Sequence, residues 1–145
     1  MPPPSLRADT RGSSQRASLL PDLVFGLRFA DGSRRCFMAE IDRGTMPVTR
    51  SNPAQTSFEK KMRLYLAAHA AGHHQRHFGW KTFRALTVTT DQNRLRSMTS
   101  ALSKTRVPNS PGATLFLFTT RADLAERGPL ARSWRDGAGR ELSLA

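Results

Sequence analysis

The segment PDLVFGLRFADGSRRCFMAEID, residues 21–42, determines the fold that the rest of the chain completes. Apolar side chains alternate from Leu23 to Phe29, which is the period of a strand with one buried face. Turn residues follow at 30–33, and a second apolar run ends at Ile41, so we predict a β-hairpin. Antiparallel pairing brings the start of the first strand beside the end of the second. We therefore expect the acidic outer ends of the hairpin to meet in space.

Downstream of the hairpin, helical and strand patterns alternate. Gly and Pro residues over 43–56 predict a long loop, after which Ser57 caps a helix that runs to about Ala71 and stops at Gly72. The polar segment His73–His77 is expected to be an exposed connection. The remaining pattern predicts a strand over 82–89, a helix from the cap Asp91 to about Ser103, a buried strand over 114–119, a short helix over 121–126 and a closing strand in the tail.

This order predicts an α/β fold with a single domain over residues 19–145. We expect a mixed β-sheet with flanking helices, in which a β-β-α-β-α-β core has restriction-endonuclease-like topology. Residues 1–18 are rich in Pro, Ser and Arg and lack apolar periodicity, so they predict a disordered basic arm. Such an arm either follows phosphates or is a linker from an upstream domain.

The charge of the chain points to a polyanionic partner. There are 23 Lys and Arg residues against 11 Asp and Glu residues, a formal net charge of +12. Most of the cations are arginine, which binds phosphate through two parallel hydrogen bonds. DNA is therefore the leading partner, because counterion release favours its binding to cationic surfaces. A genome rich in G and C, which enriches arginine everywhere, is the alternative explanation.

The sequence also bears on the compartment. A single cysteine, Cys36, excludes an intramolecular disulfide and a cysteine cluster for zinc. No apolar run approaches the roughly 20 residues that span a bilayer, and the N-terminus lacks the apolar centre of a secretion signal. We expect a cytoplasmic protein without a membrane partner.

Acidic residues at the hairpin ends and a lysine on the following helix form the candidate site. Asp22 and Glu40 are predicted to hold Mg²⁺, with Asp42 two positions further along the same strand face as a third ligand. Lys61 would orient water or stabilise charge on a phosphate. We therefore predict catalytic roles for Asp22, Glu40 and Lys61, since metal-assisted phosphodiester hydrolysis needs this combination.

These residues resemble the PD-(D/E)XK nuclease superfamily, whose core is an Asp before a strand, a hairpin and an acidic-x-lysine triplet. The triplet here reads Glu40-Ile41-Asp42, so an acid stands at the usual lysine position. Some branches of the superfamily take the lysine from the neighbouring helix, and the resemblance gives that role to Lys61 or Lys60.

A closer resemblance is to the replication-relaxation family of plasmid and integrative-element proteins. It covers roughly residues 21 to 98 and is carried by four segments: PDLVFGL at 21–27, EIDRGT at 40–45, KMRLYL at 61–66 and FRALTVT at 83–89 with Arg94 following. The resemblance implies DNA binding in plasmid replication, relaxation or conjugative mobilisation, with a relaxase or replication initiator as a partner. It also implies a winged-helix region upstream, which this chain does not contain, so the chain looks like the C-terminal domain alone. The side chains expected to contact DNA are Arg43, Lys60, Arg63, Arg84 and Arg94.

Other interpretations of the same residues stay open. In one, the chain is a non-catalytic DNA-binding or relaxosome-accessory module, and the acidic residues are only strand caps and turn formers. In another, it is a protein-interaction domain for an acidic partner. His73 and His77 suggest zinc, but no third ligand is evident. Trp80 and its aromatic neighbours can stack on bases, although aromatics beside a strand more often belong to the core.

Overall fold

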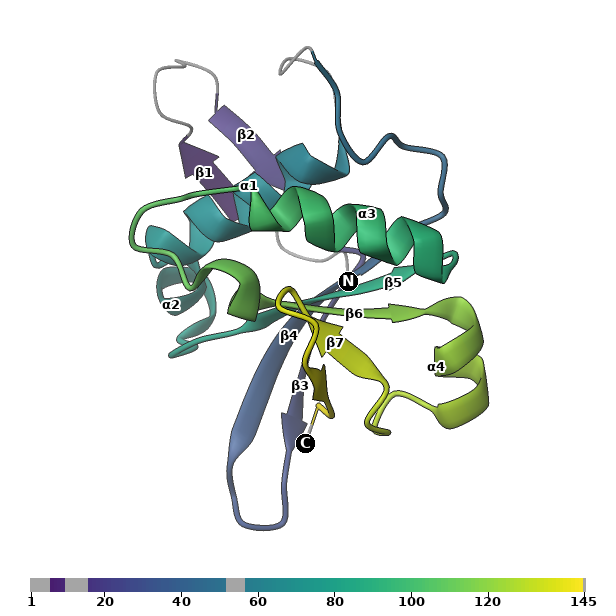
Figure 1. Cartoon of the computed structure of the whole chain (residues 1–145). Helices are drawn as coiled ribbons and strands as arrows, with labels where there is room; N and C mark the ends of the chain where they lie inside the picture. The colour runs from purple at the N-terminus through teal and green to yellow at the C-terminus, as the bar shows by residue number, and fades with distance from the viewer. Residues whose placement is uncertain (1–5, 10–15, 52–56, 145) are drawn as a thin grey trace.

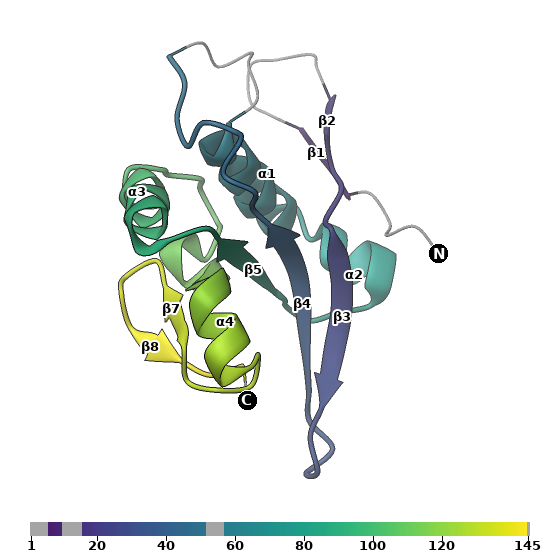
Figure 2. The same ribbon diagram turned by 90° about the vertical axis from the view of Figure 1, so that its right-hand side faces the viewer.

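The predicted hairpin is present. In the computed structural model, which describes residues 6–9, 16–51 and 57–144, strand β3 (Leu23–Arg28) pairs antiparallel with β4 (Arg34–Ile41). Leu23 lies opposite Ala39, and Arg28 lies opposite Arg34. Both views show the hairpin tip extending beyond the rest of the sheet (Figures 1 and 2).

One six-stranded mixed sheet organises the remaining elements in the order β3-β4-β5-β6-β7-β8. Strands β4, β5 and β6 are parallel, and β3, β7 and β8 are antiparallel to their neighbours. This confirms the expected α/β class with a mixed sheet and flanking helices. The further elements are α1 (Phe58–Ala70), α2 (His73–Phe78), β5 (Arg84–Thr89), α3 (Gln92–Ser103), a 3-10 turn η1 (Gly112–Leu115), β6 (Phe116–Thr120), α4 (Arg121–Arg127), β7 (Trp134–Asp136) and β8 (Glu141–Leu142).

The two longer helices begin where their cap residues predict. The backbone N–H of Lys60 donates to the Ser57 hydroxyl at 3.1 Å, and that of Arg94 donates to the Asp91 carboxylate at 2.8 Å. Each cap satisfies a backbone donor that the first helical turn leaves unpaired. Helices α1 and α3 therefore have fixed starting points, which sets where their polar side chains lie over the sheet.

A core lies on each face of the sheet. On one face, α1 and α3 pack against even-numbered positions of β4 such as Met38, and Met62, Tyr65 and Met98 are buried there. The opposite face is smaller and takes odd-numbered positions such as Phe37, which pack with side chains of β5 to β7 and of the C-terminal segment. The alternation along β4 therefore directs Glu40 to the α1 face, because Met38 and Glu40 are two positions apart.

Two expectations about local structure were wrong. The expected disordered arm contains a two-stranded antiparallel sheet, β1 (Leu6–Asp9) with β2 (Arg16–Leu19), and both strands contact α1. The remainder of that arm, 1–5 and 10–15, lies outside the described residues. The segment His73–His77 lies in helix α2, because glycines in the left-handed conformation at both ends delimit a short turn of helix.

His74 of α2 is buried beneath Phe83 and is not an exposed loop residue. None of the helices within residues 6–9, 16–51 and 57–144 has the length and hydropathy of a membrane-spanning segment.

Candidate functional site

The two acidic ends of the β3–β4 hairpin meet. Asp22 directly precedes β3, and its Oδ2 accepts a hydrogen bond of 2.8 Å from the backbone N–H of Ile41 at the end of β4. The pairing of Leu23 with Ala39 places Asp22 beside Glu40. Asp22 is exposed, whereas Glu40 is buried. The hairpin register therefore sets one accessible carboxylate next to one inaccessible carboxylate.

Helix α1 supplies the partners of Glu40. Lys61 Nζ lies 3.2 Å from Oε2, and the Tyr65 hydroxyl donates to Oε1 at 2.8 Å. Lys61 and Tyr65 are four positions apart, so they share one helical face. The structure thus brings together Asp22, Glu40 and Lys61, the three residues for which the sequence predicted catalytic roles.

Burial controls the electrostatics of this group. Burial raises the pKa of Glu40 above its usual value, and the nearby Asp22 raises it further, while Lys61 and the Tyr65 hydrogen bond oppose the shift. The pKa of Tyr65 is also raised, first by burial and then by the Glu40 charge, so its hydroxyl stays a proton donor. Glu40 is therefore a carboxylate whose charge depends on neighbouring cations.

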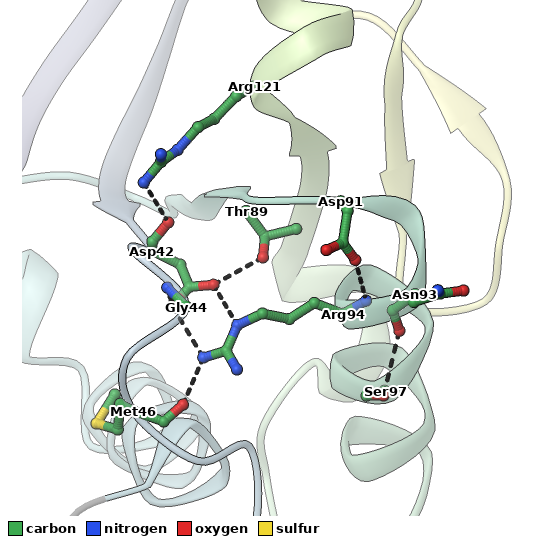
Figure 3. Close-up of polar contacts among 9 residues, drawn as sticks. All are labelled: Asp42, Gly44, Met46, Thr89, Asp91, Asn93, Arg94, Ser97 and Arg121. Carbon is green, nitrogen blue, oxygen red and sulfur yellow. Dashed lines mark hydrogen bonds and ion pairs between the residues drawn. The ribbon is translucent and has the colours of Figure 1, made fainter.

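Asp42 belongs to a different network (Figure 3). Arg94 of α3 binds it through two hydrogen bonds, Nε to Oδ2 at 2.5 Å and Nη2 to Oδ1 at 3.0 Å. The Thr89 hydroxyl donates to Oδ2 at 2.7 Å, and the backbone N–H of Gly44 donates to Oδ1 at 3.2 Å. Arg121 of α4 adds a hydrogen bond to the Asp42 backbone carbonyl at 3.2 Å. Asp42 thus joins β4, β5, α3 and α4.

The protonation states in this network follow from its contacts. Burial alone would raise the pKa of Asp42, but the hydrogen bonds from Arg94, Thr89 and Gly44 outweigh it and lower that pKa. The same contact raises the pKa of Arg94. Both groups are charged at neutral pH, so this is a buried ion pair that fixes the chain as it leaves β4.

The expected three-carboxylate ligand set is not assembled. Within 6–9, 16–51 and 57–144, no group of three or more His, Cys, Asp or Glu side chains is placed to hold a metal ion. The physical reason is the Arg94 guanidinium, which engages both oxygens of Asp42 and turns that carboxylate toward α3. Asp22 and Glu40 remain as the two carboxylates that a metal could share.

The predicted DNA-contacting side chains are dispersed. Arg43 is exposed beside the site, and Lys60 is half-buried at the start of α1. Arg63 is exposed and pairs with Glu59 at 3.4 Å. Arg94 is mostly buried on Asp42, and Arg84 lies toward the other end of the sheet, at the start of β5. The five cations therefore do not form one cluster, and only Arg43 and Arg63 are exposed on α1 or beside the end of β4.

Sequence reasoning missed Tyr65 and the pairing of Asp42 with Arg94. A signal for Tyr65 was available, because it lies one helical turn after Lys61. A signal for Arg94 was weaker, since 52 positions separate it from Asp42.

No family model, curated protein or solved structure matches the chain.

The donor set near Asp22 is compatible with Mg²⁺. That ion commonly binds one or two carboxylates and completes its shell with water and substrate phosphate. Asp22 offers Oδ1, for which no hydrogen bond to a described residue is present, and Glu40 lies next to it. Asp22 therefore offers one open oxygen beside Glu40, whose own two oxygens are engaged by Lys61 and Tyr65.

Proposed function

We propose that the chain binds DNA and holds a divalent cation between Asp22 and Glu40, in an arrangement of the nuclease type. The observation that carries the proposal is the contact of Glu40 with Lys61 beside an exposed aspartate, at one corner of a domain with a net charge of +12. Phosphodiester hydrolysis needs carboxylates, a cation and a metal in this proximity. In this proposal Asp22 and Glu40 are the carboxylates, as in the PD-(D/E)XK pattern, and Lys61 of α1 is the protein cation.

Each protein group has a role in this proposal. A bound divalent cation supplies polarisation of the phosphoryl oxygen and a lowered pKa for a bound water. Lys61 donates one of its three N–H groups to Glu40, which leaves two to contact the phosphate. Tyr65 fixes the second oxygen of Glu40 from the buried side. Exposed Arg43 and Arg63 add affinity through phosphate contacts.

The biological setting follows from the resemblance to the replication-relaxation family. The four segments that carry the resemblance include Asp22, Glu40 and Lys61. We place the chain with mobile genetic elements, in plasmid replication, relaxation or conjugative mobilisation in the cytoplasm. A relaxase or replication initiator is the protein partner that this role implies.

A second candidate is a non-catalytic DNA-binding accessory module. It is favoured by the observation that Lys61 and Tyr65 already engage both oxygens of Glu40. In addition, Asp42 stands where the superfamily places its lysine, and it serves as an ion-pair partner of Arg94. In this version the acidic residues only hold the hairpin against α1.

Nicking of supercoiled plasmid in Mg²⁺ or Mn²⁺ distinguishes the two candidates. The wild type is expected to nick, and Glu40→Gln and Asp22→Asn are expected to lose this activity while keeping salt-sensitive DNA binding. Glu59→Gln is the matched control, since it removes a carboxylate from the same helix as Lys61 and should nick normally. Metal-independent binding without nicking supports the accessory module, and absence of binding at low salt contradicts both.

A further inference from the structure

A cavity lies at the opposite end of β4 from Glu40. It has a volume of about 680 Å³, and its lining comes from the start of β4, the start of β5 and the end of α2. This volume is within the roughly 300–1,000 Å³ that small-ligand sites occupy. Its lining includes four cations, Arg34, Arg35, Lys81 and Arg84, and four aromatic side chains, Phe37, Phe78, Trp80 and Phe83.

The lining carries positive charge without an acidic residue of its own. The side chain of Arg84 is half-buried and makes no hydrogen bond or ion pair with any residue in the described part of the chain. Burial lowers the pKa of Arg84, and Arg35 and Arg140 lower it further, whereas Asp136 opposes them. Asp136 is itself buried and bound by Arg140 at 2.9 Å. An anion in the cavity would therefore satisfy the Arg84 guanidinium, which has no hydrogen-bond or ion-pair partner among residues 6–9, 16–51 and 57–144.

An aromatic surface lies beside these cations. Phe78 and Trp80 are stacked with ring centroids 4.5 Å apart and an interplanar angle of 23°. Gly79 between them has a φ of 68°, the left-handed conformation that ends α2 and lets the chain turn into the cavity wall. Trp80 is half-buried, so part of its indole is accessible to a ligand. Any of the nucleobases can stack on such a ring, because each base has an aromatic face.

We propose that this cavity binds one nucleotide, with its base stacked on Trp80 and its phosphate held by Arg84 and Arg35. The ligand combines the two chemistries that the lining offers, an aromatic plane and an anion. The inference deepens the proposed function and rests on it for the nucleotide's source, an unpaired stretch of DNA. A free nucleotide has the same chemistry and is distinguished by experiment. Glu40 lies five positions after Arg35 along β4, roughly 17 Å at 3.3 Å per residue, and the two side chains belong to opposite faces of the sheet.

Tryptophan fluorescence of the full chain tests this inference. Trp80 lies in the cavity and Trp134 is 2% exposed, so only Trp80 is expected to respond to ligand. The probes are a short oligothymidylate, a duplex of the same length and thymidine 5′-monophosphate. Saturable quenching by the oligothymidylate, with weaker quenching by the monophosphate, supports binding of an unpaired nucleotide within a strand. Equal affinity for the two supports a free nucleotide as the occupant.

Variants separate the cavity from general cationic binding. Arg84→Gln removes a charge-assisted hydrogen bond and should weaken oligothymidylate binding about tenfold. Trp80→Ala should weaken oligothymidylate binding about fivefold or more. Because this variant lacks the fluorescent reporter, its binding is measured by the anisotropy of a labelled oligothymidylate. Arg132→Gln removes the same charge from an exposed loop outside the cavity and should have little effect. Arg35→Gln, at an exposed position, repeats the test if Arg84→Gln does not fold.

The inference is overturned if no probe quenches Trp80 fluorescence, or if Arg84→Gln and Arg132→Gln weaken binding equally. Its failure is separable from failure of the proposed function. Glu40→Gln is expected to abolish nicking and to leave oligothymidylate quenching unchanged, because Glu40 lies outside the cavity. Quenching without any nicking supports nucleotide binding in the cavity and contradicts the metal site. Nicking without quenching supports the metal site and contradicts nucleotide binding in the cavity.

Discussion

Replacement of Arg94 by Leu should be among the most destabilising single changes in this chain. The substitution leaves the Asp42 carboxylate buried, with a side chain only 4% exposed, and removes both guanidinium contacts. Thr89 and Gly44 remain as its hydrogen-bond donors, and neither carries charge. An uncompensated buried carboxylate is the consequence.

The expected loss is about 3–5 kcal/mol, the usual result of removing one partner of a buried ion pair. Asp42→Asn should cost less, about 2 kcal/mol, because Arg94 can turn its guanidinium toward water. Arg63→Leu is the matched control. Its guanidinium is 48% exposed and lies 3.4 Å from Glu59, so its loss should cost no more than about 0.5 kcal/mol.

Guanidinium chloride unfolding, followed by circular dichroism at pH 7, measures these differences. The double variant Asp42→Asn with Arg94→Leu should recover part of the loss, since it removes the unpaired charge. The pKa of Asp42 is lowered in the folded state, so the contribution of the pair is complete above the unfolded pKa of about 3.9. It disappears as pH falls through the lower folded value. A loss below about 1 kcal/mol for Arg94→Leu, or equal losses for Arg94→Leu and Arg63→Leu, would refute the reasoning.

Three further predictions concern the scaffold. Ser57→Ala removes the α1 cap and should lower the free energy of unfolding by about 1 kcal/mol in urea titration, whereas no change would show that the cap contributes nothing. Gly137→Ala should cost roughly 1–3 kcal/mol in the same assay, because its Cβ would lie 2.7 Å from Leu102 Cδ2 and 2.9 Å from a backbone oxygen; an unchanged midpoint contradicts this. Burial lowers the pKa of His74, so thermal stability should fall as pH drops below about 6.5, and His74→Leu should flatten that dependence. An identical pH profile for wild type and His74→Leu would show that His74 is not the cause of the fall in stability at low pH.

The hairpin and the helix starts could be predicted because their causes are local. Alternation between Leu23 and Phe29 reports one buried face, and Ser57 and Asp91 mark helix starts through hydrogen bonds that span only three residues. The meeting of Asp22 with the end of β4 also followed from the turn, since a hairpin register fixes which residues face each other. Local rules therefore located the two carboxylates of the site.

Long-range pairing explains what the sequence did not reveal. Arg94 was expected to contact DNA and Asp42 to bind metal, yet the two neutralise each other across 52 positions. Periodicity gives the strand face of Asp42 but not the helix that packs over it. The cavity around Arg84 and Trp80 likewise depends on how α2 packs beside the sheet, and a polar histidine-rich segment carries no periodic signal for a helix only six residues long.

Binding of Mn²⁺ in solution gives the sharpest test of a shared metal at Asp22 and Glu40. The signal of free Mn²⁺, followed by electron paramagnetic resonance during titration with wild type, should show one bound ion per chain. Glu40→Gln should abolish this binding, and the control Glu59→Gln should preserve it. Wild type that binds no Mn²⁺, or Glu40→Gln that binds as wild type does, would contradict the nuclease-type site.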